Sequence, residues 1–212
     1  MREIWFAGLA ALTLAGALPA AAQAPKPVDD ATAQSLLAPS RQDRVLGKSD
    51  APITIIEYAS LSCPHCANFA GKVLPKLKEK WIDPGKAKLV LRAFPLDEPA
   101  MRAEMVARCA PSERYFPLVE TLFETQDKWV VAKDWQAALQ RIAQLAGVTK
   151  TKFETCVANK ALEDEVAQSR LTAAQQLGVN STPTFFINGK KYDGEPSLEA
   201  FDKLLSGLAG KS

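Results

Sequence analysis

The sequence predicts an α/β fold in which a block of helices interrupts a sheet-forming domain. Three observations predict this fold. A strand-helix-strand pattern covers residues 52–94, helical periodicity without a strand covers 97–177, and a hairpin with a final helix follows Gly178. The 212 residues and their 47% hydrophobic content are sufficient for a domain with a sizeable core.

Residues 1–22 have the pattern of an export signal. Arg2 is followed by an uncharged apolar run from Ile4 to Leu18, and Pro19 and three alanines then supply small residues for cleavage. The alternative is a membrane anchor, but the run is shorter than the roughly 18 residues expected of a membrane span. We therefore expect residues 1–22 to be removed as a signal peptide and the mature protein to be exported.

Residues 23–49 mix Pro, Ala, Ser and charged residues, which predicts an exposed N-terminal extension that is partly helical at most. Across the chain, 26 basic and 24 acidic residues are interspersed. This charge pattern gives no indication of binding to nucleic acid or to a membrane surface.

Residues 52–59 are rich in β-branched and aromatic side chains, which predicts a strand buried on both faces. A helix should follow from Pro64 to about Trp81, since proline suits the first helical turn. Pro75 lies inside this helix and predicts a kink one turn before it. A turn at 83–85 then leads to a second strand at 88–94, which completes a βαβ unit.

Apolar residues in 97–177 recur at helical spacing and predict about four helices without a strand. Thr151 and Glu154 have the spacing of a capping box at the start of one of them. The methionine and aromatic residues of this block are expected to be core residues.

Strands return after Gly178. Residues 184–187 and 190–192 flank Asn188 and Gly189, a pair typical of a tight hairpin turn. Ser197 is expected to cap the final helix. Residues 50–96 and 178–210 are therefore predicted to form one domain, with 97–177 as a helical insertion.

The Cys63-Pro64-His65-Cys66 motif lies directly after the first strand and opens the first helix. At a helix N-terminus, unpaired N–H groups and the helix dipole stabilise a thiolate at Cys63. His65, the only histidine, can donate to or pair with that thiolate; the alternative is a solvent-facing turn residue. This placement predicts a redox site in which Cys63 and Cys66 form a disulfide.

Two other uses of paired cysteines are disfavoured by spacing. A c-type haem attachment requires histidine directly after the second cysteine, but that position is Ala67. A zinc site requires two further ligands, and the remaining thiols, Cys109 and Cys156, are far apart without a second cysteine or histidine pair. We therefore expect neither a metal nor a cofactor.

Residues 45–208 resemble the DsbA family of thioredoxin-fold thiol oxidases. The motifs that carry the resemblance are EYASLSCPHC at 57–66 and VNSTPTFFING at 179–189. The resemblance implies a thioredoxin fold with an inserted α-helical domain. It assigns catalytic roles to Cys63, Cys66, His65, Pro64 and Glu57, and substrate binding to Thr182 and Pro183.

Two of these assignments have simpler alternatives. Pro183 matches the cis proline of the family, which faces the redox cysteines, but from the sequence alone it could be an ordinary strand-entry proline. Glu57 matches a buried acid beneath Cys66, whose raised pKa allows proton exchange with that thiol. Its alternative is a glutamate at a strand end that reaches solvent.

Cys109 and Cys156 both lie in the helical block, where some members of the family have a second, non-catalytic disulfide. The resemblance therefore implies a structural bridge between them. The alternative is a pair of buried, reduced thiols.

The family also implies a function: a periplasmic protein thiol:disulfide oxidoreductase that passes its Cys63–Cys66 disulfide to newly translocated proteins through a mixed disulfide. Its substrates would be unfolded or extended proteins with free thiols, and a membrane quinone-linked DsbB-type protein would reoxidise it. A disulfide isomerase or reductase of the same fold, and a binding or chaperone module without redox activity, remain alternatives.

Overall fold

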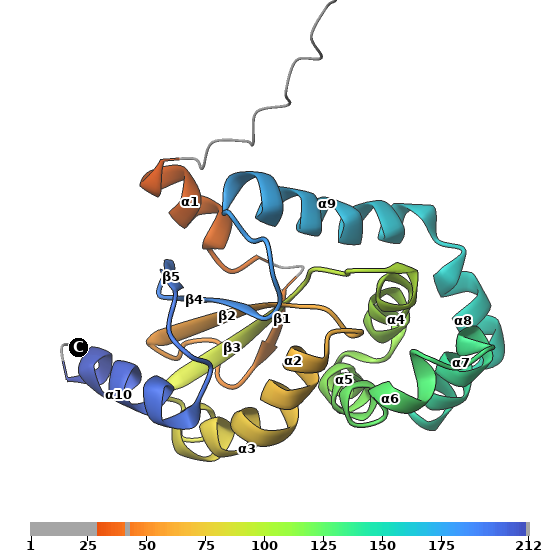
Figure 1. Ribbon diagram of the computed structural model, residues 1–212, viewed down its shortest axis with the longest axis horizontal. Helices are drawn as coiled ribbons and strands as arrows, with labels where there is room; N and C mark the ends of the chain where they lie inside the picture. The colour runs from red at the N-terminus through yellow and green to blue at the C-terminus, as the bar shows by residue number, and fades with distance from the viewer. Residues whose placement is uncertain (1–28, 41–42, 211–212) are drawn as a thin grey trace, which may run out of the picture.

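The computed structural model describes residues 29–40 and 43–210, so the predicted signal peptide lies outside the described residues. One five-stranded sheet, in the order β1-β3-β2-β4-β5, forms the centre of the fold (Figure 1). Its strands are β1 Arg44–Leu46, β2 Ile53–Ala59, β3 Ala87–Ala93, β4 Thr184–Ile187 and β5 Lys190–Tyr192. β2 and β3 are parallel and the other neighbouring strands are antiparallel.

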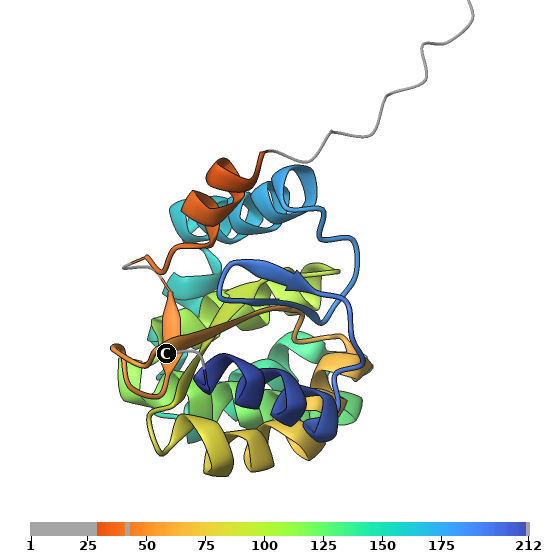
Figure 2. The same cartoon turned by 90° about the vertical axis from the view of Figure 1, so that its left-hand side faces the viewer.

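The sheet is covered on both faces. The α-helices are α1 Asp30–Leu37, α2 Pro64–Asn68, α3 Leu74–Leu77, α4 Glu98–Cys109, α5 Tyr115–Glu124, α6 Gln126–Trp129, α7 Trp135–Leu145, α8 Lys150–Val157, α9 Lys160–Gln176 and α10 Leu198–Ala209. α3 and α10 lie on one face and α1 and α9 on the other, as the two views show (Figures 1 and 2). β2 is accordingly buried on both faces: Ile55 packs with Phe69 and Phe201, whereas Ile56 packs with the cluster that contains Leu177.

The helix after β2 is interrupted where the sequence predicts a kink. Residues Phe69–Val73 form a π-helical segment between α2 and α3, and a second one, Lys78–Ile82, follows α3. Pro75 has no N–H, and its ring excludes the Gly71 carbonyl from the usual position one turn earlier. The first π-helical segment is therefore the local response to this proline.

The helical insertion has more helices than the sequence predicts. Residues 97–177 hold six α-helices, α4 to α9, and a short 3-10 turn at Ser112–Arg114. The expected capping box at Thr151 is wrong: the N-cap of α8 is Thr149, whose side chain accepts from the Lys152 N–H at 3.2 Å. Thr149 lies at the point where the chain turns into the helix, so Thr151 falls inside the first turn.

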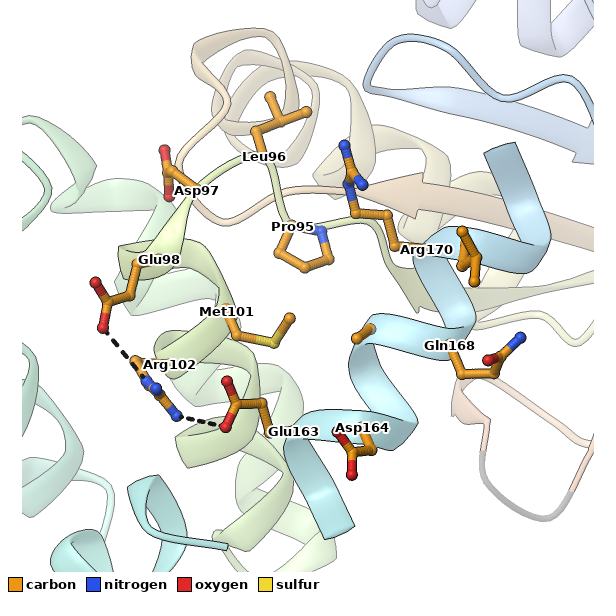
Figure 3. Close-up of a pocket in the computed structure, with 12 residues that line it drawn as sticks. Pro95, Leu96, Asp97, Glu98, Met101, Arg102, Glu163, Asp164, Gln168 and Arg170 are labelled. Atoms are coloured by element: carbon orange, nitrogen blue, oxygen red, sulfur yellow. Dashed lines mark ion pairs between the residues drawn. The ribbon is translucent and has the colours of Figure 1, made fainter. Parts of the chain in front are cut away.

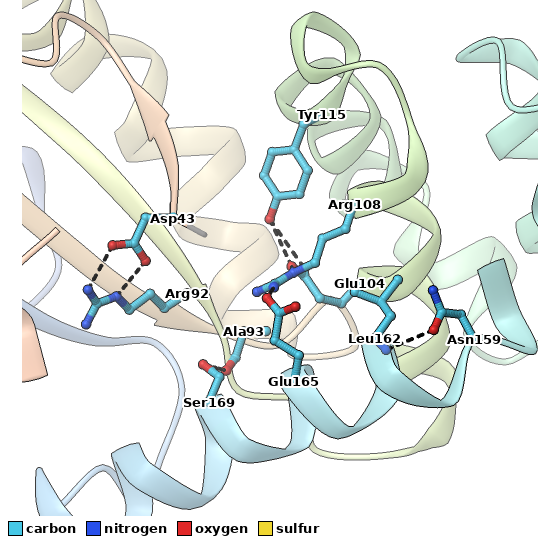
Figure 4. Close-up of polar contacts among 10 residues, drawn as sticks. All are labelled: Asp43, Arg92, Ala93, Glu104, Arg108, Tyr115, Asn159, Leu162, Glu165 and Ser169. Carbon is cyan, nitrogen blue, oxygen red and sulfur yellow. Dashed lines mark hydrogen bonds and ion pairs between the residues drawn. The ribbon is translucent and has the colours of Figure 1, made fainter. Parts of the chain in front are cut away.

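The segment predicted as an exposed extension contains a helix and a strand. β1 pairs antiparallel with β3 and becomes the edge of the sheet, which the sequence analysis missed. Arg92 of β3 holds this segment: its guanidinium donates to both carboxylate oxygens of Asp43 at 2.9 Å and to the Leu36 and Ala38 carbonyls (Figure 4). The N-terminal segment is therefore fixed to the sheet by a buried ion pair as well as by a strand.

A second group of buried polar contacts lies within the helical insertion. Glu104 accepts from Arg108 at 2.7 Å and from the Tyr115 hydroxyl at 3.2 Å, and Arg108 also reaches Glu165 (Figure 4). These contacts join α4 to α5 and α9.

In the part of the chain that the structure describes, no helix has the length and apolar character needed to cross a bilayer.

Candidate functional site

The two cysteines of the Cys63-Pro64-His65-Cys66 motif lie where β2 gives way to α2. Cys63 is the N-cap of α2, and its N–H donates to the Ser60 carbonyl at 3.0 Å. Both cysteines are free thiols in this structure, which therefore represents the reduced form of the predicted disulfide. Cys63 is 4% exposed and Cys66 is 0% exposed, so both residues are buried.

The environment of Cys63 favours its thiolate. A hydrogen bond from the Cys66 side chain, with smaller contributions from the backbone N–H groups of Cys66 and His65, lowers the pKa of Cys63 from 9.0 to about 5. Burial opposes this shift. Two of these donors are N–H groups of the first turn of α2, as expected for a sulfur at a helix N-terminus.

Cys66 has the opposite character. Burial, with the hydrogen bond that it gives to Cys63 and the nearby charge of Glu57, raises its pKa far above the ordinary value. The motif therefore combines one sulfur that is stable as an anion with one that is stable as a protonated thiol.

The loop before β4 is distant from Cys63 in the sequence but packs against it. The Cys63 Sγ donates to the Thr182 carbonyl at 3.2 Å, and the Thr182-Pro183 peptide bond is cis. The hydroxyl of Thr182 is buried without a hydrogen bond partner among the described residues. Thr182, which is 119 positions after Cys63 in the sequence, thus contacts the Cys63 sulfur through its carbonyl.

Glu57 is buried in the middle of the sheet, opposite Leu91 of β3 and Phe185 of β4. It is 3% exposed, and its Oε1 has no hydrogen bond partner in the described residues. Burial, together with repulsion from Cys63, raises the pKa of Glu57 from 4.5 to about 8. The carboxyl group can therefore hold a proton near neutral pH, and the strand-end alternative does not apply.

Pro64 and His65 are exposed at the start of α2. Pro64 is the first residue of the helix, where its missing N–H is not needed. His65 contributes a backbone N–H to the stabilisation of Cys63. A role of its imidazole remains a prediction.

Cys109 and Cys156 are joined in a disulfide, with their Cα atoms 6.3 Å apart. The bridge connects the end of α4 to α8, within the helical insertion and away from the paired thiols of α2. The alternative of two reduced thiols does not describe this structure.

One residue of the site was not found from the sequence. Gln126, the first residue of α6, is buried and donates to the carbonyls of Leu61 and Cys63. The only signal in the sequence is a polar residue between the apolar positions Phe123 and Trp129, which is common at helix surfaces.

A cavity of about 820 Å³ lies away from the cysteines, and neither Cys63 nor Cys66 lines it. It lies between the start of α4 and α9, and Leu96, Met101 and Arg170 are among the residues that line it (Figure 3). A smaller cavity of about 250 Å³ lies beside Pro183, between the loop before β4 and the residues that follow β5. The smaller cavity is lined by Pro183 and Thr184, next to the residue whose carbonyl contacts Cys63. The described residues contain no cluster of three metal-ligating side chains.

A mixed sheet of this order, with a Cys-x-x-Cys pair at the start of the helix that follows its central strand, defines a thioredoxin-fold protein with a dithiol site. The Thioredoxin family model matches residues 40–206. The crystal structure of alpha-DsbA1 from Wolbachia pipientis superposes with a TM-score of 0.79 and 36% sequence identity, over 84% of this chain and 96% of that one. The chain belongs to the thioredoxin family and, within it, to the DsbA proteins.

Two sequence relatives agree with this family. A Rickettsia bellii protein named "Putative protein-disulfide oxidoreductase" is 33% identical over 77% of this chain, which spans 64% of that protein's length. A Bacillus cereus protein named "Probable disulfide bond formation protein D" is 28% identical over 76% of this chain and 77% of its own length.

Proposed function

We propose that this chain is an exported thiol:disulfide oxidoreductase that donates the Cys63–Cys66 disulfide to proteins with free thiols. The observation that carries the proposal is the difference between the two sulfurs. The pKa of Cys63 falls from 9.0 to about 5, so its thiolate predominates at neutral pH, whereas Cys66 is buried and favours its thiol. Because only the reduced protein has this thiolate, the shift favours reduction of the enzyme and oxidation of its substrate.

The proposed reaction has two exchange steps. A substrate thiolate attacks the Cys63 sulfur, a substrate–Cys63 disulfide forms, and Cys66 leaves with the electron pair of the broken bond. Glu57 supplies the proton that Cys66 then takes up, since both groups favour their protonated forms. A second thiolate of the substrate attacks the substrate sulfur of the mixed disulfide, and Cys63 leaves as a thiolate.

Thr182 and Pro183 are the proposed substrate-binding residues. Their backbone lies against Cys63, and the cavity beside Pro183 leaves room for a substrate chain. Pairing of an extended segment through backbone hydrogen bonds would accept many sequences. Unfolded or extended proteins are therefore the proposed substrates.

Export and reoxidation complete the proposal. The apolar pattern of residues 1–22 supports removal of a signal peptide and a periplasmic location. Each turnover leaves the enzyme reduced, so a membrane quinone-linked protein of the DsbB type is the proposed oxidant that restores the disulfide.

The direct test is a trap of the mixed disulfide. In Cys66→Ala, Cys63 is first converted to a mixed disulfide with thionitrobenzoate; a reduced, unfolded substrate with a single cysteine should then attack the Cys63 sulfur and release thionitrobenzoate. The covalent Cys63–substrate complex should accumulate, because neither protein has a second thiol to break it. The double variant Cys63→Ala, Cys66→Ala should form none and should not oxidise the substrate. Mass spectrometry of the alkylated products identifies the linked cysteine.

The alternatives give other results. An isomerase would restore activity to a scrambled substrate faster than it oxidises a reduced one. A binding or chaperone module would retain its full effect on substrate folding in the double variant, which would refute the redox proposal.

A further inference from the structure

The helical insertion reaches the redox site through the side chain of Gln126. Its Nε2 donates to the Leu61 carbonyl at 2.9 Å and to the Cys63 carbonyl at 3.1 Å. The side chain is 9% exposed, and both contacts are buried. One amide group therefore uses both of its hydrogens on the short turn that leads into the nucleophile.

The position of Gln126 is fixed by the helices around it. Thr125 ends α5 with φ −106° and ψ 14°, and its hydroxyl donates to the Thr121 carbonyl at 2.7 Å. One turn later, fully buried Trp129 donates from Nε1 to the Leu122 carbonyl at 2.8 Å. Both hydrogen bonds lead back to α5. They connect α6 to α5 and fix the position of Gln126 beside the turn before α2.

Cys63 is held by contacts from separate parts of the chain. Its N–H donates to the Ser60 carbonyl, and its carbonyl accepts from the Ala67 N–H at 3.1 Å as well as from Gln126. Its sulfur donates to the Thr182 carbonyl. Among these hydrogen bonds, the one from Gln126 comes from the helical insertion.

We propose that Gln126 is a positioning residue for the redox reaction, which holds the Leu61–Cys63 turn so that the sulfur faces Thr182 and the first N–H groups of α2. The inference rests on the proposed function of Cys63 as the nucleophile. The role of Gln126 gives a physical reason why the helical insertion packs against the Leu61–Cys63 turn. Donation to the two carbonyls also draws their negative ends toward the amide, which lessens their repulsion of a thiolate.

The test replaces Gln126 with methionine and with glutamate. Gln126→Met keeps the length and volume of the side chain but has no donor. Gln126→Glu, when ionised, can only accept and places a charge against two carbonyls. Gln144→Ala, at an exposed position of α7, is the matched control.

The thiolate of the reduced protein is titrated by its absorbance at 240 nm, and the equilibrium with glutathione is measured for each variant. Gln126→Met should raise the pKa of Cys63 by about 0.5 to 1 unit, so that roughly three- to tenfold less thiolate is present below that pKa. Its equilibrium should shift toward the oxidised enzyme by a similar factor. Gln126→Glu should shift both further, and Gln144→Ala should match the wild type.

Chemical unfolding of the oxidised and reduced forms separates positioning from a purely structural role. Loss of positioning should destabilise the reduced form more than the oxidised form. Equal destabilisation of both forms, with an unchanged Cys63 pKa and glutathione equilibrium, would overturn the inference. A wild-type Cys63 that titrates at its ordinary value would instead refute the proposed function, so the two failures are distinguishable.

Discussion

Cys63 and Cys66 are identical in covalent structure but differ in every contact that determines their chemistry. Cys63 receives a hydrogen bond from Cys66 and lies near the first N–H groups of α2, whereas Cys66 is buried near the acid of Glu57. The contacts of Cys63 favour its thiolate, and those of Cys66 favour its protonated thiol. Together they separate the pKa values of the two cysteines widely. Cys63 is 4% exposed and Cys66 is fully buried, which is consistent with the proposed attack on Cys63.

His65→Ala measures how much of this difference comes from the imidazole. The backbone N–H of residue 65 remains in the variant, and it is this group that contributes to the lowered Cys63 pKa. We expect the pKa of Cys63 to rise by less than about 1 unit and the disulfide to become less oxidising. The 240 nm titration measures the shift, and a pKa identical to the wild type would limit His65 to its backbone role.

At this scale the sequence predicts the residues whose chemistry is visible in the motif itself. Cys63 and Cys66 follow from their spacing and from the strand before them, whereas Glu57 is assigned only through the resemblance to the DsbA family. Gln126 could not be predicted, because its role depends on how α6 packs against a turn more than 60 residues earlier. A polar side chain that is important only through a tertiary contact has no local pattern.

Among the elements, the segment with α1 and β1 is held on the sheet by the pairing of β1 with β3 and by one arginine of β3. Arg92 and Asp43 are both largely buried, and the guanidinium also donates to the Leu36 and Ala38 carbonyls. Because a charge left without its partner in such a place is strongly unfavourable, this pair determines whether the N-terminal segment stays on the sheet.

Asp43→Ala should lower the free energy of unfolding by about 3 kcal/mol or more, since it leaves the Arg92 charge buried without a carboxylate. Adding Arg92→Met should cause less further loss than Arg92→Met alone, because the pair acts as a unit. Urea unfolding of the three variants gives both values. Glu154→Ala, which removes an exposed i,i+4 pair, is the control and should change stability by less than about 1 kcal/mol; additive losses for Asp43 and Arg92 would contradict the expectation.

The elements that the sequence predicts best are those with their own periodicity. β2, β3 and the β4–β5 hairpin agree with the prediction to within a residue or two, and Pro75 indicates the π-helical segment before it. β1 is missed because three residues at a sheet edge are too few for an alternating pattern, and its pairing depends on β3. α6 is short and directly follows α5, so the sequence shows one helical stretch where the structure has two helices.

For the molecule as a whole, the Cys109–Cys156 bridge should act on stability and not on redox chemistry. It closes a loop of 47 residues within the helical insertion. The double variant Cys109→Ala, Cys156→Ala should lower the free energy of unfolding by about 4 kcal/mol. The Cys63 titration should be unchanged, and an altered pKa would show that the bridge influences the redox site.

The stability of the reduced protein should depend on pH through two opposing groups. The pKa of Cys63 is lowered to about 5 in the folded protein. Its contribution to the free energy of unfolding is therefore complete above pH 9 and is lost as the pH falls toward 5. The pKa of Glu57 is raised to about 8, so its contribution is complete below pH 4.5 and is lost as the pH rises through 8. Between pH 5 and 8 the two slopes should largely cancel.

Glu57→Gln removes one of these slopes. The reduced variant should gain stability from pH 5 to pH 8, with a slope approaching 1.4 kcal/mol per pH unit. The oxidised wild type, which lacks a titrating Cys63, should instead lose stability over the same range. Urea unfolding at several pH values measures both trends, and parallel curves for the two proteins would contradict this assignment.

The separation of 119 positions between Cys63 and Thr182 also imposes an order on biosynthesis. When Cys63 and Cys66 have just been synthesised, the segment with Thr182 that covers them has not yet been made. The strands that enclose Glu57 and the helical insertion that carries Gln126 are also still missing. The two sulfurs at that stage are those of an ordinary unfolded client. The newly made enzyme therefore passes through a period in which it needs protection from the same exchange chemistry that it will later perform.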